Sequence, residues 1–287
     1  MKIAVMSDIH GNHVAFESCL DFLKEKEVDG YIFLGDYVGE FPYTEKTMEL
    51  IYDLKRKYSC YIIRGNKEDY QLSGLGKDNS KWDDYPSTVG MLRYAAKHTR
   101  EKDLQFFASL PITMRVEIPG LPPLRICHGS PRNVKEDIRK GCSVNQEIFA
   151  EVSEEYIICG HTHRVTDMNE YEKTVWNPGS VGVSLDGSAK AQLMILHGEN
   201  EKWKPEFLAV AYDTDKVIGE MKDERLFELA PCWSRVSESL LRGGTVSHGR
   251  VLWRAMELCE KEMGECNWPM IPERYWEQAC EEMLQNL

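Results

Sequence analysis

The sequence predicts an α/β protein, with parallel strands in its N-terminal part and helices in its C-terminal part. Short apolar, β-branched segments alternate with segments of helical period from Lys2 to Ile63, and such alternation favours parallel strands joined by right-handed crossovers. From about Asp213 the apolar residues keep a helical period to the C-terminus. We therefore expect a larger domain over residues 1–212 and a helical extension over residues 213–287, packed on that domain.

The individual elements follow from apolar periodicity and from Gly and Pro breaks. Strands are expected at 2–7, 31–34, 60–63, 112–118, 124–127 and 156–159, and an antiparallel pair at 191–197 and 206–212. Helices are expected at 14–27, at 44–57 with Thr44 as N-cap, over much of 68–110 around a loop at 74–84, and within 132–153. Residues 177–182 form a turn-rich segment, and the C-terminal helices break near Pro231, Gly243 and Pro269.

Composition and charge narrow the class of protein. Apolar residues make up 42% and charged residues 29% of the chain, as in an ordinary globular protein. No apolar segment approaches the length of a membrane span and the first residues lack signal-peptide features, so we expect a cytoplasmic protein with no membrane partner. The net charge of −12 argues against general nucleic-acid binding. It does not exclude an anionic substrate, because bound cations reverse the local field.

The nine cysteines do not predict a disulfide framework or a zinc ribbon. None forms a Cys-x-x-Cys pair, the number is odd, and Cys60, Cys127 and Cys159 fall within predicted strands. Free cysteine in such positions behaves as a small apolar residue. We expect reduced, structural cysteines in a reducing compartment.

Metal-binding residue types follow five of the predicted strands. They are Asp8 and His10, Asp36, Asn66, His128, and His161 and His163. Neighbouring glycines permit sharp exits from the strands, and groups just outside the carboxyl ends of strands in an open α/β sheet meet at one edge. Any one of these residues alone would more often be a helix cap or a buried polar group. Together they exceed the needs of one metal and suit two, with one carboxylate as a bridge.

The ordered set resembles the calcineurin-like metallophosphoesterase superfamily. Its blocks are Asp8-x-His10, Gly35-Asp36, Gly65-Asn66, His128 and Gly160-His161-x-His163, and they lie within about residues 2–212. The segment Asn177-Pro178-Gly179-Ser180 is similar to the compact bacterial and archaeal phosphodiesterase branch. The resemblance implies a four-layer fold, a β-sandwich of two mixed sheets flanked by helices. It also implies a hydrolase that acts on phosphate esters.

The resemblance further implies the roles of the site residues. Asp8, His10 and His163 would hold the first metal, Asp36 would bridge, and Asn66, His128 and His161 would hold the second. Asp36, Asn66, His128 and Lys67 are the expected catalytic residues. The cofactors would be two divalent cations that activate a hydroxide, with Mn expected first, and Fe, Zn, Ni and Co also compatible with mixed nitrogen and oxygen ligands.

One position departs from the family pattern. The third block usually continues with His and then an acidic residue, and here it reads Gly65-Asn66-Lys67-Glu68. The family's histidine is thought to contact phosphate and to help protonate the leaving group. Lysine supplies a positive charge, but with an ordinary pKa it is a poor acid at pH 7. Lys67 either contacts the phosphate or faces solvent with no role.

Other residues have two interpretations each. Asn12 could reach the phosphate, although capping the helix that begins near residue 14 is preferred. Arg64, Arg132 and Arg164 could bind substrate phosphate or form ion pairs. His98, His197 and His248 are expected on the surface or in the core. Four tryptophans of the C-terminal region suggest base stacking, but helical spacing favours core positions for Trp233, Trp253, Trp268 and Trp276.

The expected activity is hydrolysis of a phosphodiester or a nucleotide phosphoanhydride, and diadenosine tetraphosphate is a specific candidate. The partner would then be a phosphate-containing small molecule; no oligomeric state is indicated. One alternative is a phosphomonoesterase, including a protein phosphatase. A second is a non-catalytic metal-binding interaction module, because the retromer subunit with this fold shows that the scaffold can serve protein binding.

Overall fold

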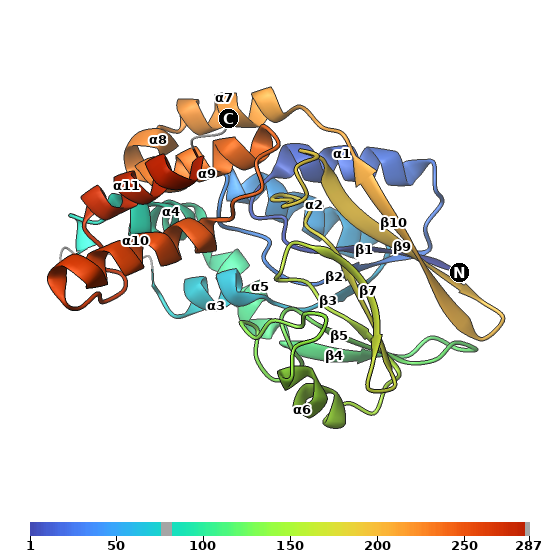
Figure 1. Cartoon of the computed structure of the whole chain (residues 1–287). Coiled ribbons are helices and arrows are strands. Elements are labelled where there is room, and N and C mark those ends of the chain that lie inside the picture. The colour runs from blue at the N-terminus through green and yellow to red at the C-terminus, as the bar shows by residue number, and fades with distance from the viewer. Residues whose placement is uncertain (76–81, 285–287) are drawn as a thin grey trace.

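The computed structural model describes residues 1–75 and 82–284, and in these residues ten strands form two mixed sheets of five strands each (Figure 1). The first sheet has the order β10-β9-β1-β2-β3 and the second β4-β5-β6-β8-β7. The strands of the first sheet are β1 (Lys2–Met6), β2 (Gly30–Phe33), β3 (Ser59–Ile62), β9 (Ala191–Glu199) and β10 (Lys202–Val210). Those of the second are β4 (Thr113–Val116), β5 (Leu124–Cys127), β6 (Tyr156–Ile158), β7 (Val165–Glu170) and β8 (Lys173–Pro178).

The expected parallel strands form the centre of the first sheet. β1 pairs parallel with β2, and β2 with β3, while the crossovers run through α1 (His13–Lys24) and α2 (Thr44–Lys57). β9 and β10 pair antiparallel, as expected. Thr44 is not the N-cap of α2: Tyr43 holds that position in a left-handed conformation, and the buried Thr44 hydroxyl has no hydrogen-bond partner.

The hairpin of β7 and β8 in the second sheet was not expected from the sequence. β7 is an edge strand, paired only with β8, and Met168 is its one buried residue. An edge strand that buries a single side chain has too few apolar residues to produce a clear strand pattern. The hairpin nonetheless determines the path by which the chain returns from the histidines after β6 to the interior of the protein.

Apolar side chains from both sheets meet between them, which makes the molecule a sandwich. Ile3, Val5 and Ile32 of the first sheet share a buried cluster with Ile126 and Ile158 of the second. The outer face of the first sheet is covered by α1, α2 and α5 (Glu101–Ser109), and that of the second by α6 (Val144–Ala150). The expected four-layer arrangement is thus confirmed. Between α3 (Asn66–Leu72) and α4 (Pro86–His98), residues 76–81 of the expected loop lie outside the described part.

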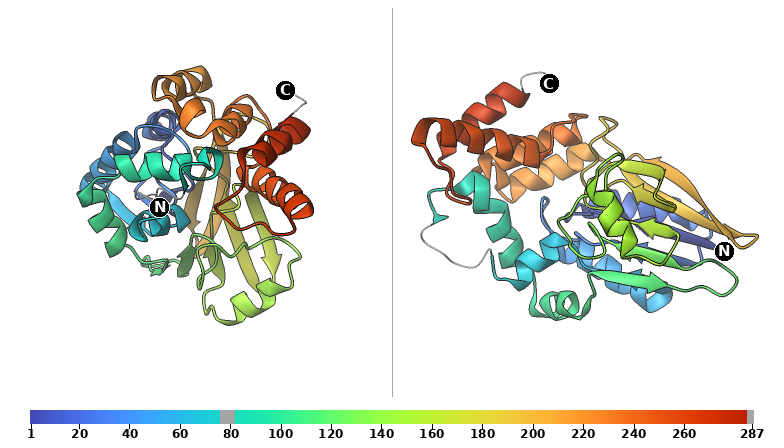
Figure 2. Two further views of the ribbon diagram at one scale, coloured as in Figure 1. Left: turned by 90° about the vertical axis from the view of Figure 1, so that its left-hand side faces the viewer. Right: turned by 60° about the horizontal axis from the view of Figure 1, so that its bottom comes forward.

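The C-terminal region is helical and gathers at one end of the sandwich (Figures 1 and 2). Its helices are α7 (Thr214–Asp223), α8 (Leu226–Leu229), α9 (Pro231–Leu241), α10 (His248–Met263) and α11 (Glu273–Leu284). Their apolar faces form one buried cluster that also contains Val14, Phe41, Met91 and Val183. These helices therefore share a core with the segments that follow β1, β2 and β8.

The four C-terminal tryptophans do not all lie in the core. Trp276 is fully buried, and its indole nitrogen donates a 2.8 Å hydrogen bond to Thr88 Oγ1. The core expectation is wrong for Trp253, which is 75% exposed, and for Trp268, which is 40% exposed. On α10 the buried residues include Val251 and Ala255, and Trp253, between them in sequence, points to the opposite side of the helix.

Two chain-wide expectations can be compared with the structure. All nine cysteines are free, and six of them are fully or almost fully buried among apolar residues. None of the helices in the described ranges combines the length and the apolar character that a membrane crossing requires.

We predict that Trp276→Ala lowers the free energy of unfolding by about 3–5 kcal/mol, because it opens a cavity and leaves the Thr88 hydroxyl without its donor. Denaturant titration followed by circular dichroism measures the change. Trp253→Ala is the matched control, and its exposed ring predicts a change within about 0.5 kcal/mol. Equal losses of unfolding free energy for the two variants would contradict a core shared by the C-terminal helices and the sandwich.

Candidate metal centre

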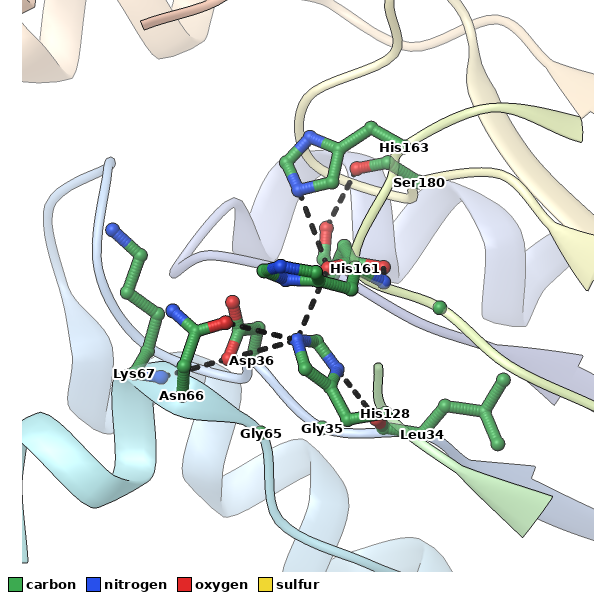
Figure 3. A network of polar contacts seen from close by, with 12 residues as sticks. Leu34, Gly35, Asp36, Gly65, Asn66, Lys67, His128, His161, His163 and Ser180 are labelled. Atoms are coloured by element: carbon green, nitrogen blue, oxygen red, sulfur yellow. Dashed lines mark hydrogen bonds and ion pairs between the residues drawn. The ribbon is translucent and has the colours of Figure 1, made fainter. Parts of the chain in front are cut away.

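The seven candidate ligands come from loops and helix starts that directly follow strands, as the sequence predicts. Asp8 and His10 follow β1, Asp36 follows β2, Asn66 begins α3 after β3, His128 follows β5, and His161 and His163 follow β6. Asp8, His10, Asp36, Asn66 and His128 are buried, whereas His161 and His163 are partly exposed. Figure 3 shows Asp36, Asn66, His128, His161 and His163 converging on one region.

Five of these residues have a left-handed backbone, which is uncommon outside glycine. The φ values are 56° at Asp8, 54° at His10, 55° at Asp36, 66° at His161 and 54° at His163. Each such conformation costs about 1–3 kcal/mol and persists only where surrounding contacts impose it. The chain therefore holds these side chains at a stability cost, a common feature of functional sites.

Backbone and carboxylate hydrogen bonds impose this conformation on the loops. The amide of Asp8 donates to the Gly35 carbonyl at 3.1 Å, and the amide of His10 to the Asp36 carbonyl at 2.9 Å. The buried Glu68 carboxylate accepts from the amides of Asp36, Tyr37 and Gly65, each at 2.8 Å. One side chain of α3 thus ties the loop after β2 to the loop after β3.

A first group of ligand atoms surrounds Asp8. His163 Nε2 lies 3.2 Å from Asp8 Oδ1 and 3.0 Å from His10 Nε2, and His10 Nε2 lies 3.8 Å from the same oxygen. Two imidazole nitrogens at 3.0 Å need a proton or a cation between them, because their lone pairs otherwise repel. This group contains the three residues expected for the first metal.

A second group forms around His128. His128 Nε2 lies 3.5 Å from Asp36 Oδ1, 3.9 Å from Asp8 Oδ1 and 3.2 Å from Asn66 Oδ1. The other Asp36 oxygen, Oδ2, lies 3.8 Å from His10 Nε2. Asp36 thus presents one oxygen to each group, as a bridging carboxylate would. Asp8 Oδ1 is also close to both.

His161 lies at the edge of the second group. Its ring centroid is 5.1 Å from that of His128, while its Nε2 lies 3.6 Å from Asp137 Oδ1. Its backbone amide donates to Asp8 Oδ2 at 3.1 Å. The sequence placed His161 among the ligands but did not single out Asp137, which lies in a polar connecting loop without any motif.

The donor set fits divalent cations. Asp8 Oδ1 and His10 Nδ1 are buried and lack a hydrogen-bond partner among the described residues, an arrangement that is costly unless a ligand completes it. The Nδ1 atoms of His128 and His163 face the carbonyls of Leu34 and Val183 at 2.8 and 2.9 Å. These contacts orient both rings with Nε2 toward the group, as is usual for metal-binding histidines.

The site's charges are strongly coupled. Burial alone would raise the pKa values of Asp8 and Asp36, but nearby imidazoles lower them, chiefly His163 for Asp8 and His128 for Asp36, whose pKa falls to about 2. Burial would lower the pKa of His128, yet Asp36 and Asp8 raise it to about 10. The carboxylates are thus ionised, and they attract positive charge to this point.

A carboxylate that the sequence did not single out connects the site to the C-terminal helices. Glu40 Oε1 lies 2.5 Å from Lys67 Nζ and 3.7 Å from His10 Nδ1, and Glu40 Oε2 accepts a 2.9 Å hydrogen bond from Trp233 Nε1. Glu40 is 5% exposed. Its signal in the sequence is weak: an acidic residue within the mostly apolar and glycine-containing segment 35–41.

Lys67 does not face solvent. Its side chain is 13% exposed and paired with Glu40, and it lies 5.6 Å from the Trp233 ring centroid. Burial would lower its pKa, but Glu40 and Asp36 raise it above the ordinary value. The alternative of a solvent-facing lysine is therefore wrong.

A cavity of about 460 Å³ opens beside both groups. Its lining includes five of the candidate metal ligands, His10, Asp36, Asn66, His161 and His163, and two further expected site residues, Lys67 and Arg164. The start of α10 contributes Ser247, His248, Gly249, Arg250 and Trp253.

Two expected substrate-binding residues do not line this cavity. Asn12 caps α1, accepting a 3.0 Å hydrogen bond from the Ala15 amide, and its amide group donates to Gly182. Arg64 is held by Asp69 and the Leu110 carbonyl. Their side chains are occupied within the protein, so the substrate-binding assignments of Asn12 and Arg64 are corrected to structural roles. Arg132 is likewise paired, with Glu136 and Glu151.

Comparison with known proteins agrees with this geometry. Residues 1–201 match the model of the calcineurin-like phosphoesterase superfamily domain. The uncharacterized protein MJ0912 of Methanocaldococcus jannaschii is 29% identical over 240 residues, which are 79% of this chain and 94% of that protein. A symmetrical bis(5′-nucleosyl)-tetraphosphatase of Wigglesworthia glossinidia brevipalpis is 35% identical over only 69 residues, 24% of this chain and 25% of that enzyme.

Solved structures share the fold. The hypothetical protein PH1004 from Pyrococcus horikoshii OT3 superposes with a TM-score of 0.71 at 24% identity, covering 85% of this chain and 99% of that one. A metallophosphoesterase from Sphaerobacter thermophilus gives 0.63 at 23% identity, covering 80% and 98%. With the family model spanning more than half of the sequence, the chain belongs to the calcineurin-like phosphoesterase superfamily and is a metallophosphoesterase.

Proposed function

We propose that the protein hydrolyses a phosphodiester or a nucleotide phosphoanhydride, with two divalent metal ions, manganese first among the candidates, as cofactors. The observation that carries the proposal is the meeting of the two ligand groups around Asp8 and Asp36 beside an open cavity. When bound, such cations lower the pKa of water and offset charge that develops on the phosphoryl oxygens.

The residue roles follow from position. We assign Asp8, His10 and His163 to the first metal and Asn66, His128 and His161 to the second, with Asp36 as the bridge. The two oxygens of Asp36, 3.8 Å from His10 Nε2 and 3.5 Å from His128 Nε2, support that bridge. Asp8 Oδ1, which is near both groups, contributes negative charge to each.

The surroundings of Lys67 favour substrates with good leaving groups. A lysine whose pKa is raised by Glu40 and Asp36 stays protonated at pH 7 and gives up its proton poorly. Its charge is also partly neutralised by Glu40. Lys67 would therefore position phosphate rather than protonate a leaving alkoxide, so phosphate or nucleotide leaving groups are preferred to simple alcohols.

Sequence similarity also bears on the nucleotide part of the proposal. The match to the bis(5′-nucleosyl)-tetraphosphatase covers 69 residues, which is consistent with a nucleotide substrate such as diadenosine tetraphosphate. We also propose that residues 1–212 form the catalytic domain and residues 213–287 an extension packed on it. The buried cluster that joins both parts supports the packing of the extension on that domain.

We predict that metal-stripped protein reconstituted with Mn²⁺ hydrolyses bis-p-nitrophenyl phosphate and diadenosine tetraphosphate at least 10-fold more efficiently than phenyl phosphate, a monoester of a poorer leaving group. Ten-fold corresponds to about 1.4 kcal/mol in the barrier. The measurement is kcat/KM for each compound at pH 7. Preference for phenyl phosphate would contradict the argument from Lys67 and support the monoesterase alternative. Turnover of none of the three, with metal bound, would contradict hydrolysis of this substrate class.

We also predict that Mn²⁺ binds with two equivalents and raises the thermal midpoint of the stripped protein. At 100 times the dissociation constant, one site stabilises the fold by about 2.7 kcal/mol. His163→Ala should lose one equivalent and about half of the shift, because it removes a nitrogen close to Asp8 and His10. Calorimetry and elemental analysis provide the readouts.

His197→Ala is the control for metal binding, since this histidine pairs with Glu206 on the first sheet and lines no part of the cavity. It should keep both equivalents. A shift that survives His163→Ala unchanged would count against the ligand assignment.

A further inference from the structure

An aromatic ring at the rim of the cavity contributes nothing to the buried core. Trp253 on α10 is 75% exposed and lines the cavity. Tryptophan is enriched at interfaces, where a partner covers its ring. The indole nitrogen of Trp253 forms no hydrogen bond with any of the described residues. The ring therefore has an open face beside the candidate metal centre.

A chain of side-chain contacts fixes α10 against that centre. Glu40, which contacts His10, accepts the hydrogen bond of Trp233. The Trp233 ring stacks on His248, with centroids 4.5 Å apart, and His248 is buried and 2.9 Å from Ser237 Oγ. His248 is the first residue of α10. Trp253, five residues later, stands about 7–8 Å farther along the helix axis.

Positive charge accompanies the ring. Arg250 lies three positions before Trp253, on neighbouring parts of the same helix face. Arg250 and Arg164 both line the cavity, and neither guanidinium has an ion pair among the described residues, in a chain with a net charge of −12. The positive end of the α10 dipole, whose N-cap is Ser247, adds to the attraction for an anion.

We propose that Arg250 and Trp253 form a nucleoside phosphate subsite, in which Arg250 binds a phosphate next to the one that reacts and Trp253 stacks on the base. The inference rests on the proposed function and narrows its substrate class to nucleotides. A nucleobase supplies the flat ring that an exposed indole takes up, and its phosphates supply the negative charge for the arginines. A nucleic-acid polymer is disfavoured, because its phosphates would face an acidic protein surface.

The test compares two ligands that differ only in the nucleoside. Isothermal titration of Mn²⁺-loaded protein uses adenosine 5′-(α,β-methylene)diphosphate and the monomethyl ester of methylenediphosphonate, which have the same number of ionisable oxygens and a bridge that hydrolysis does not cleave. Metal chelation is common to both ligands and cancels in the ratio of their dissociation constants. Stacking of one base predicts that the nucleoside compound binds about 5- to 150-fold more tightly.

Variants of α10 residues test which side chains cause the tighter binding of the nucleoside compound. Trp253→Ala should abolish most of the ratio and Trp253→Phe should keep it, whereas Arg250→Ala should weaken binding of both compounds. Met263→Ala and Arg254→Ala are the matched controls, because Met263 is an exposed apolar residue of the same helix and Arg254 pairs with Glu257 and Glu282. Both should leave the ratio unchanged. All four side chains are exposed or half-buried, and circular dichroism verifies folding.

Titration without turnover separates this inference from the proposed function. Wild-type protein that hydrolyses bis-p-nitrophenyl phosphate but binds both analogues equally overturns the subsite and leaves the hydrolase intact. A ratio that survives Trp253→Ala also overturns it, since the base is then bound elsewhere. A ratio lost in Trp253→Ala and kept in the controls supports the subsite, even in protein that fails the hydrolysis assay.

Discussion

The site depends on the burial of negative charge next to imidazole. Asp8 is completely buried and Asp36 almost so, and ionised carboxylates are stable in such surroundings only with positive or hydrogen-bonding partners. The histidines after β1, β5 and β6 supply these partners, and the strands of both sheets must end at one place for them to do so. The two-sheet sandwich meets this requirement because its parallel strands β1, β2 and β3 face β5 and β6 across a shared apolar core.

The convergence of the seven candidate ligands could be predicted because each of them follows a predicted strand and five of them lie beside a glycine, and both features are local in sequence. Glu40 and Glu68 could not be predicted in this way. Their importance comes from atoms distant in sequence: the amides of Asp36 and Tyr37, which donate hydrogen bonds to Glu68, and the lysine and indole that Glu40 contacts. The corrections for Asn12 and Arg64 have the same origin, since a polar side chain beside a motif can bind the protein as readily as a substrate.

The C-terminal helices show a second limit of sequence patterns. Helical period and breaks predicted where the helical region begins and its interruptions near Pro231, Gly243 and Pro269, but not the break between α7 and α8 or which face of α10 would be buried. Val251 and Ala255 enter the core, and the ring between them in sequence remains outside. Aromatic residues are core residues on average, so a single exposed tryptophan cannot be recognised until neighbouring helices are placed. The helices also provide part of the cavity lining, which makes the shape of the site a property of the whole chain.

The left-handed residues have a consequence for natural variation. Asp8, His10, Asp36, His161 and His163 each hold a conformation that glycine or asparagine adopts with less strain. Substitution by glycine would therefore relax the backbone while removing a candidate metal ligand, and asparagine would relax it while replacing the carboxylate or imidazole with a neutral amide. Selection for stability alone would erode this site, whereas selection for activity retains it. Members of the superfamily that have lost catalysis could thus gain robustness as folded scaffolds, a route by which an enzyme fold becomes available for other uses.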